Sequence, residues 1–85
     1  MKFKSFKNKA NVIGKNIKKY RELRGYSQRT LSNRLALLGV TIYHNEISRI
    51  ENQKLFIKDY EILAFCKALN ITKDELFENT DNIFD

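Results

Sequence analysis

The run Tyr43-His44-Asn45-Glu46-Ile47-Ser48-Arg49-Ile50-Glu51-Asn52 has the clearest pattern in this chain. At 3.6 residues per turn, Ile47 and Ile50 share the apolar side of a predicted helix. The other side is polar throughout and carries His44, Asn45, Ser48, Arg49 and Asn52. Asn and Arg form paired hydrogen bonds with adenine and guanine edges in the DNA major groove. The pattern predicts a helix that is buried on one side and equipped to contact bases on the other.

A merely solvated polar face is the alternative interpretation, and for an isolated helix it would be the better one. The charge of the flanking sequence favours the base-contacting interpretation. The chain has 85 residues and a net charge of +6. Residues 71–85 hold one lysine and five acidic residues, a net −4, which leaves +10 on residues 1–70. Such a basic segment attracts a polyanion and supplies non-specific affinity for nucleic acid.

Composition excludes several other classes of protein. A chain of this length forms one domain. Its single cysteine, Cys66, cannot form an internal disulfide, and with one histidine it makes no plausible zinc site. No set of side chains resembles a catalytic constellation, so we expect neither an enzyme nor a metal or cofactor. No apolar run is long enough for a membrane span, and we expect a soluble, cytoplasmic protein without a membrane partner.

Five helices are expected. The first spans residues 11–24, with Ile13, Ile17 and Tyr20 inward and Gly25 at its end. Ser27 should cap a second helix, which ends at Gly39 and buries a leucine stripe. That stripe consists of Leu31, Leu35 and Leu38. The third helix is the run at 43–52. Tyr43 does not cap helices, so Thr41 or a tight first turn should satisfy the free amides there.

The remaining segments are also marked by polar residues. Asp59 is expected to cap a fourth helix that Asn70 ends, and Thr72 opens a fifth helix through a capping box with Glu75. The inward positions expected in the fourth helix are Ile62, Leu63, Phe65, Cys66 and Leu69. We expect a basic flexible arm over residues 1–10, the helix-turn-helix domain over residues 11–78 and an acidic tail over residues 79–85. A compact all-α bundle follows.

Taken in order, these motifs closely resemble the Xre-like family, the Cro and cI-repressor type of helix-turn-helix protein. The resemblance covers residues 12–77 and rests on the ordered combination of five segments. They are Ile13-Gly14-Lys15-Asn16-Ile17 to Arg21-Glu22-Leu23, Tyr26-Ser27-Gln28, Ile47-Ser48-Arg49-Ile50-Glu51-Asn52, Tyr60-Glu61-Ile62-Leu63-Ala64, and Leu69-Asn70-Ile71-Thr72-Lys73-Asp74-Glu75-Leu76-Phe77. It implies a five-helix bundle of the phage-repressor DNA-binding type. The second and third helices would form the helix-turn-helix.

The resemblance also implies roles for single residues. Base contacts are expected from His44, Asn45, Ser48 and Arg49. Contacts to the DNA backbone are expected from Gln28, Tyr43, Asn52 and Lys54, and Arg29 joins them because it lies near the start of the second helix. Arg21 and Glu51 match a buried structural ion pair. In the family, Gln28 also braces the third helix.

Three positions depart from the family pattern. The connection from Ala36 to Tyr43 is about five residues longer than the usual turn of 3–4 residues, as in a subgroup with an extended second helix and turn. Ser32 replaces the usual small alanine where the two helices cross. Gln53 stands where the family usually has glycine.

Two hypotheses about function follow. The first is a sequence-specific double-stranded DNA-binding transcriptional regulator, a repressor in its most common form, which the resemblance implies could work as a homodimer, formed in some cases only on DNA. The second is a protein-interaction module on the same fold, such as an antitoxin or an adaptor with a protein partner.

Overall fold

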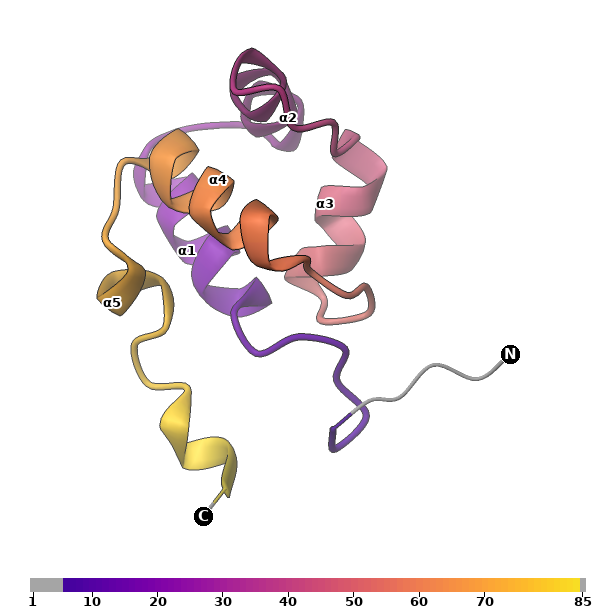
Figure 1. The fold of residues 1–85 in the computed structure, drawn as a ribbon, viewed down its shortest axis with the longest axis vertical. Coiled ribbons are helices and arrows are strands. Elements are labelled where there is room, and N and C mark those ends of the chain that lie inside the picture. The colour runs from indigo at the N-terminus through magenta and orange to yellow at the C-terminus, as the bar shows by residue number, and fades with distance from the viewer. Residues whose placement is uncertain (1–5, 85) are drawn as a thin grey trace.

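The computed structural model describes residues 6–84, which fold into a series of helices packed against one another (Figure 1). The elements are α1 (Gly14–Leu23), α2 (Gln28–Leu37), α3 (His44–Glu51), α4 (Asp59–Leu69), α5 (Lys73–Leu76) and a 3₁₀ turn η1 (Asp81–Phe84). Phe6 and Lys9 form an isolated antiparallel bridge, and no strand lies in residues 6–84. The all-helical expectation is confirmed. None of the described helices is long and apolar enough to cross a membrane.

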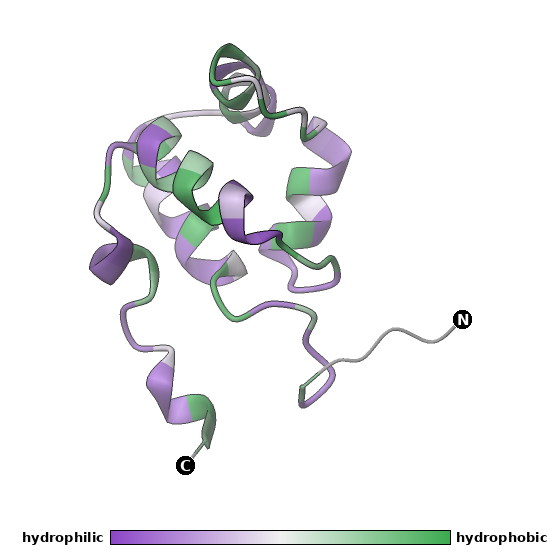
Figure 2. Ribbon diagram, viewed as in Figure 1, coloured by the Kyte–Doolittle hydropathy of each residue, from purple (hydrophilic) through white to green (hydrophobic). Residues whose placement is uncertain are grey.

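The core lies where α1 and α4 meet α2 and α3. Its fully buried side chains include Ile17 from α1, Leu35 from α2, Ile47 from α3 and Phe65 from α4. Figure 2 shows hydrophobic positions of α3 on the side that faces the other helices and hydrophilic positions on its outer side. The apolar stripe of each helix is therefore buried against its neighbours, which is how a small bundle gains most of its stability.

The expected helix boundaries agree with the backbone at four places. Gly25 and Asn70 adopt left-handed conformations, with φ of 73° and 55°, at the ends of α1 and α4. The Ser27 hydroxyl accepts a hydrogen bond from the Thr30 amide at the start of α2. Thr72 and Glu75 bond reciprocally across the first turn of α5. These short-range signals depend only on neighbours in sequence, so the sequence was enough to predict them.

Two predictions about helix starts were wrong. The N-cap of α4 is Lys58, not Asp59, and the Glu61 carboxylate accepts from the Lys58 amide at 2.7 Å. At α3, neither Thr41 nor a tighter turn provides the cap. Instead the Glu46 carboxylate reaches back to accept from the Tyr43 amide at 3.0 Å. In both helices the acidic residue at the third position, and not the residue before the helix, satisfies the free amide.

Two leucines expected inside lie outside. Leu38 is 44% exposed because α2 ends at Leu37 and the chain turns away there. Leu63 is 56% exposed, while its neighbours Ala64 and Phe65 are buried. The α4 helix is covered by α1 and α2 on one side and by α5 near its end. The buried side is therefore rotated toward Phe65 and away from Leu63.

A nearly buried ion pair joins α1 to α3. Arg21 donates from Nε to one Glu51 oxygen at 2.7 Å and from a terminal nitrogen to the other at 3.1 Å. The side chains are only 12% and 3% exposed. The hydrogen bond from Arg21 to Glu51 raises the pKa of the guanidinium above its ordinary value. Gly14 and the Ile50 carbonyl form the second close contact of these helices: a Cβ at Gly14 would lie 2.0 Å from that oxygen.

The segment after α5 runs back along α1. The Asn16 amide donates to the carbonyl oxygens of Leu76 and Glu78, at 2.8 and 2.9 Å. Lys19 and Tyr20 both donate to the Glu78 carboxylate, at 2.7 and 2.6 Å. Farther on, the Phe6 and Phe84 rings lie 5.3 Å apart, and the Lys7 ammonium group donates to the Ile83 carbonyl. Residues 1–5 of the predicted basic arm lie outside the described residues.

Removing one partner of the Arg21–Glu51 pair should destabilise the protein strongly. We expect Glu51→Leu to lower the free energy of unfolding by about 3–5 kcal/mol, because it leaves the Arg21 charge uncompensated in a nearly buried place. Urea denaturation measures this loss. Glu22→Leu, at an exposed position of α1, is the matched control and should have little effect. The double variant Arg21→Met/Glu51→Leu should recover much of the loss, and a double variant no more stable than Glu51→Leu would contradict this explanation.

Glu78 should make stability depend on pH. Its bonds from Lys19 and Tyr20 lower its pKa, and the bond to Glu78 raises the pKa of Tyr20 to about 12. Since the folded pKa of Glu78 lies below the unfolded value of about 4.3, its stabilisation is present above that value and is lost as the pH falls through the folded pKa. We expect Glu78→Gln to lower the melting temperature at pH 7 and to differ less from the parent below about pH 4. Asp74→Asn, at an exposed position of α5, is the control.

Candidate nucleic-acid interface

The outer face of α3 brings together the four residues predicted to contact bases. His44, Asn45 and Arg49 are exposed, and Ser48 is half-buried. Arg49 forms no ion pair and no side-chain hydrogen bond with the rest of residues 6–84. Its guanidinium can therefore direct all five N–H donors to an external acceptor. On the same face, Asn52 donates one side-chain N–H to the Ser48 carbonyl at 2.9 Å, which leaves its second N–H and its side-chain oxygen for a ligand.

The start of α3 faces a shallow hollow on α2. Arg29, Ser32, Asn33, Tyr43 and His44 line this hollow, which has a volume of about 210 Å³. Arg29 and Tyr43, both predicted to contact the DNA backbone, therefore lie on one surface, and Tyr43 is 62% exposed. This surface continues the polar face of α3 toward α2.

Gln28 reaches the far end of α3. Its side-chain amide donates to the Glu51 carboxylate at 3.1 Å, the same carboxylate that Arg21 holds. Arg21 also donates to the Tyr26 carbonyl at 2.9 Å, in the turn between α1 and α2. One carboxylate at the end of α3 thus ties together α1, the first turn of α2 and α3. The bracing of α3 by Gln28 has a direct structural basis.

The connection between α2 and α3 is long but held at both ends. It comprises the six residues 38–43, since α2 ends at Leu37. The connection is therefore two or three residues longer than a usual turn of about 3–4 residues, and not the expected five. Ile42 is 3% exposed and anchors the connection in the core. The Ser32 hydroxyl donates to the Ile42 carbonyl at 2.6 Å. Serine at the helix crossing therefore provides a hydrogen bond that alanine could not.

The end of α3 is shaped by Gln53. This residue has φ of 61°, and the amides of Gln53 and Lys54 donate to the carbonyls of Ile50 and Arg49. That is the hydrogen-bond pattern of a Schellman motif, in which glycine is usual at the position of Gln53. Here the glutamine side chain is buried and donates to the Asn11 carbonyl at 3.1 Å. The turn has Schellman geometry with glutamine in place of glycine, and it leaves Lys54 exposed just beyond α3.

Two basic side chains of α1 and α2 have a structural role that the sequence did not reveal. Arg24 donates to the carbonyls of Leu69 and Asn70, and Arg34 donates to the carbonyl of Ala68. They cap the end of α4, where the helix dipole favours positive charge. Arg34 also lies over the Tyr26 ring, 4.8 Å from its centroid. These arginines are engaged within the bundle, whereas Arg29 makes no such contact with the described residues 6–84.

Comparison with protein-family models, curated proteins and solved structures finds no significant match to this chain.

Residues 6–84 contain no group of three His, Cys, Asp or Glu side chains that could hold a metal ion. Cys66 is buried at α4, and desolvation raises the pKa of its thiol. The surface of α3 and its neighbours therefore offers the best indication of function.

Ser32→Ala should loosen the connection before α3. The change leaves the partly buried Ile42 carbonyl without its donor, so we expect unfolding free energy to fall by about 1–3 kcal/mol. Amide hydrogen exchange should also become faster at the start of α3. Thr41→Ala, at an exposed position of the same connection, is the control and should change neither quantity. Equal effects of the two substitutions would show that the Ser32 bond does not order the connection.

Proposed function

We propose that this protein is a sequence-specific double-stranded DNA-binding transcriptional regulator of the repressor type, with α3 placed in the major groove. The observation that carries the proposal is Arg49, which is exposed and has no side-chain partner among residues 6–84, on a helix whose opposite side is fixed by a buried ion pair. A bidentate arginine contact to guanine O6 and N7 is the commonest specific contact in protein–DNA complexes. The Xre-like resemblance of residues 12–77 supports the same proposal.

In this proposal one group of side chains contacts the DNA bases and another contacts the phosphates. Asn45 and Arg49 supply base readout, with His44 and Ser48 beside them on the same face. Contacts to phosphate come from Gln28, Arg29, Tyr43, Asn52 and Lys54, which surround that face. Phosphate contacts set the position and orientation of α3, and the base contacts select the sequence. Neither acidic residue of α3 is unbonded: Glu51 is buried on the opposite side against Arg21, and Glu46 accepts from the Tyr43 amide.

Selection from a random DNA pool tests the proposal. Bound duplexes are enriched and sequenced, and the affinity for the enriched sequence is compared with that for a scrambled duplex across salt concentrations. A specific regulator should prefer its sequence by about a thousandfold or more. Weak, unselective and steeply salt-dependent binding would overturn the proposal and favour the protein-interaction module.

Substitutions at Arg49 and Lys54 should weaken DNA binding in different ways. We expect Arg49→Ala to cost about 1–3 kcal/mol on the selected sequence and much less on scrambled DNA, so that preference falls. Lys54→Ala should weaken both duplexes equally and reduce the salt slope by about one. Lys18→Ala, on the exposed side of α1, is the control. Equal losses of both variants on both duplexes would refute the assignment of roles.

A further inference from the structure

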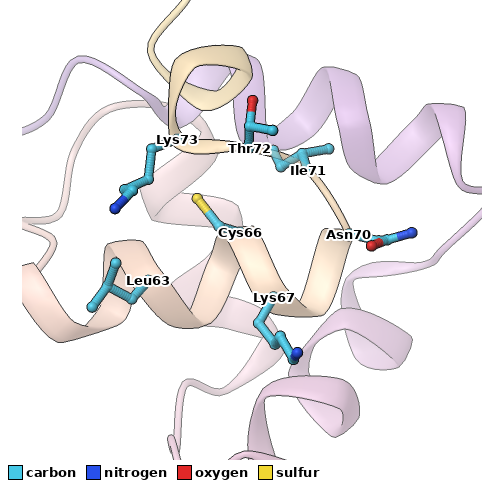
Figure 3. A pocket seen from close by; sticks show the side chains of 7 residues that line it. All are labelled: Leu63, Cys66, Lys67, Asn70, Ile71, Thr72 and Lys73. Atoms are coloured by element: carbon cyan, nitrogen blue, oxygen red, sulfur yellow. The ribbon is translucent and has the colours of Figure 1, made fainter.

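A groove lies between α4 and the start of α5, away from the α3 face. It has a volume of about 400 Å³, and the apolar part of its lining, here called its floor, consists of Leu63, Cys66 and Ile71. Figure 3 shows these side chains. Lys67 and Lys73 lie on opposite sides of Cys66 in this view. Leu63 is 56% exposed, so more than half of an apolar side chain lacks cover. Burial keeps the Cys66 thiol protonated, since it raises the thiol pKa, and the floor remains uncharged.

The lysines of the groove have no acidic partner among residues 6–84. Neither Lys67 nor Lys73 forms an ion pair with any carboxylate in residues 6–84. An apolar floor with two uncompensated positive charges is complementary to a segment that combines an apolar side chain with a carboxylate. Leu63 and Lys67 are four residues apart on α4 and so share one side of that helix. A segment that binds in this groove therefore needs one apolar side chain next to one acidic side chain.

The 3₁₀ turn η1 presents that combination. Side chains three residues apart eclipse in a 3₁₀ helix, so Asp81 and Phe84 lie on the same side of η1. Both are exposed, and the Phe84 side chain is 76% exposed although it touches Phe6. Residues 78–84 contain two acidic residues and no basic one. The outward side of η1 therefore matches the groove in apolar character and in charge.

The η1 turn cannot reach the groove of its own chain. Asn16 holds Leu76 and Glu78 on α1, and Lys7 holds Ile83 on the N-terminal turn. Figure 1 shows the segment after α5 leading away from α4. These contacts keep η1 folded and expose its outer side, and they direct it away from the groove. The occupant must come from another molecule.

We propose that the α4–α5 groove receives the outward side of η1 from a second copy of this chain, with Phe84 over Leu63 and Asp81 between Lys67 and Lys73. The contact buries one aromatic side chain and pairs a few exposed charges, so it belongs to the small, transient class of interfaces. The groove is formed by α4 and α5, and the polar face of α3 stays uncovered. The proposal is independent of DNA binding and concerns the protein alone.

Sedimentation velocity of the full chain, from about 10 µM to about 1 mM without DNA, tests the proposal. We expect the sedimentation coefficient to rise with concentration. Phe84→Ala should weaken association about tenfold or more, as expected when a buried aromatic anchor is truncated. A parent chain that stays monomeric throughout, or a Phe84→Ala variant that associates as tightly as the parent, would overturn the proposal.

A charge exchange separates a specific contact from a folding defect. One variant, Lys67→Glu/Lys73→Glu, carries an acidic groove, and the other, Asp81→Lys/Asn82→Lys, carries a basic η1. Each alone should fail to associate because groove and η1 then have the same sign, whereas an equimolar mixture restores both contacts and should associate. Lys18→Glu/Lys58→Glu is the control for general charge change and should behave like the parent. A mixture that remains monomeric, or single variants that associate normally, would contradict the proposal.

Discussion

The Glu51 carboxylate is the point on which the arrangement of helices depends. It is 5% exposed and receives three hydrogen bonds, two from Arg21 and one from Gln28. A charge in such a place is tolerated only when it is paired and fully bonded. Because these bonds need one rotation of α3, they place Ile47 and Ile50 inside and Arg49 outside. The same rotation of α3 therefore buries the charge of Glu51 and exposes the charge of Arg49.

Further contacts hold both ends of α3 (His44–Glu51). Glu46 bonds to the Tyr43 amide at the start, and the Gln53 turn closes the end, where Ala10 and Asn11 join it. The Asn11 side chain donates to the carbonyls of Ile50 and Leu55. A helix of eight residues has little stability alone. These contacts make it a rigid carrier for its polar side chains, as selective contact with bases requires.

The sequence predicted the ends of the helices better than it predicted which side of each helix is buried. Helix ends at Gly25, Ser27, Asn70 and Thr72 follow from neighbouring residues and were predicted. Leu38 and Leu63 were placed wrongly, because helical spacing shows that a stripe exists but not which side of α4 its neighbours cover. The bonds of Arg24 and Arg34 to the end of α4 join residues at least 34 positions apart. No local pattern contains them. The polar α3 face was visible in the sequence since one short helix carries all of it.

The central claim is that Arg49 contacts a guanine in the major groove, and base-analogue substitution tests it most directly. Each guanine of the selected duplex is replaced by 7-deazaguanine, which lacks the N7 acceptor, and binding is measured for the parent and for Arg49→Ala. The account predicts one position per bound chain at which the analogue weakens the parent about tenfold or more and leaves Arg49→Ala unchanged. Equal losses for both proteins at every position, or no loss at any guanine, would contradict it.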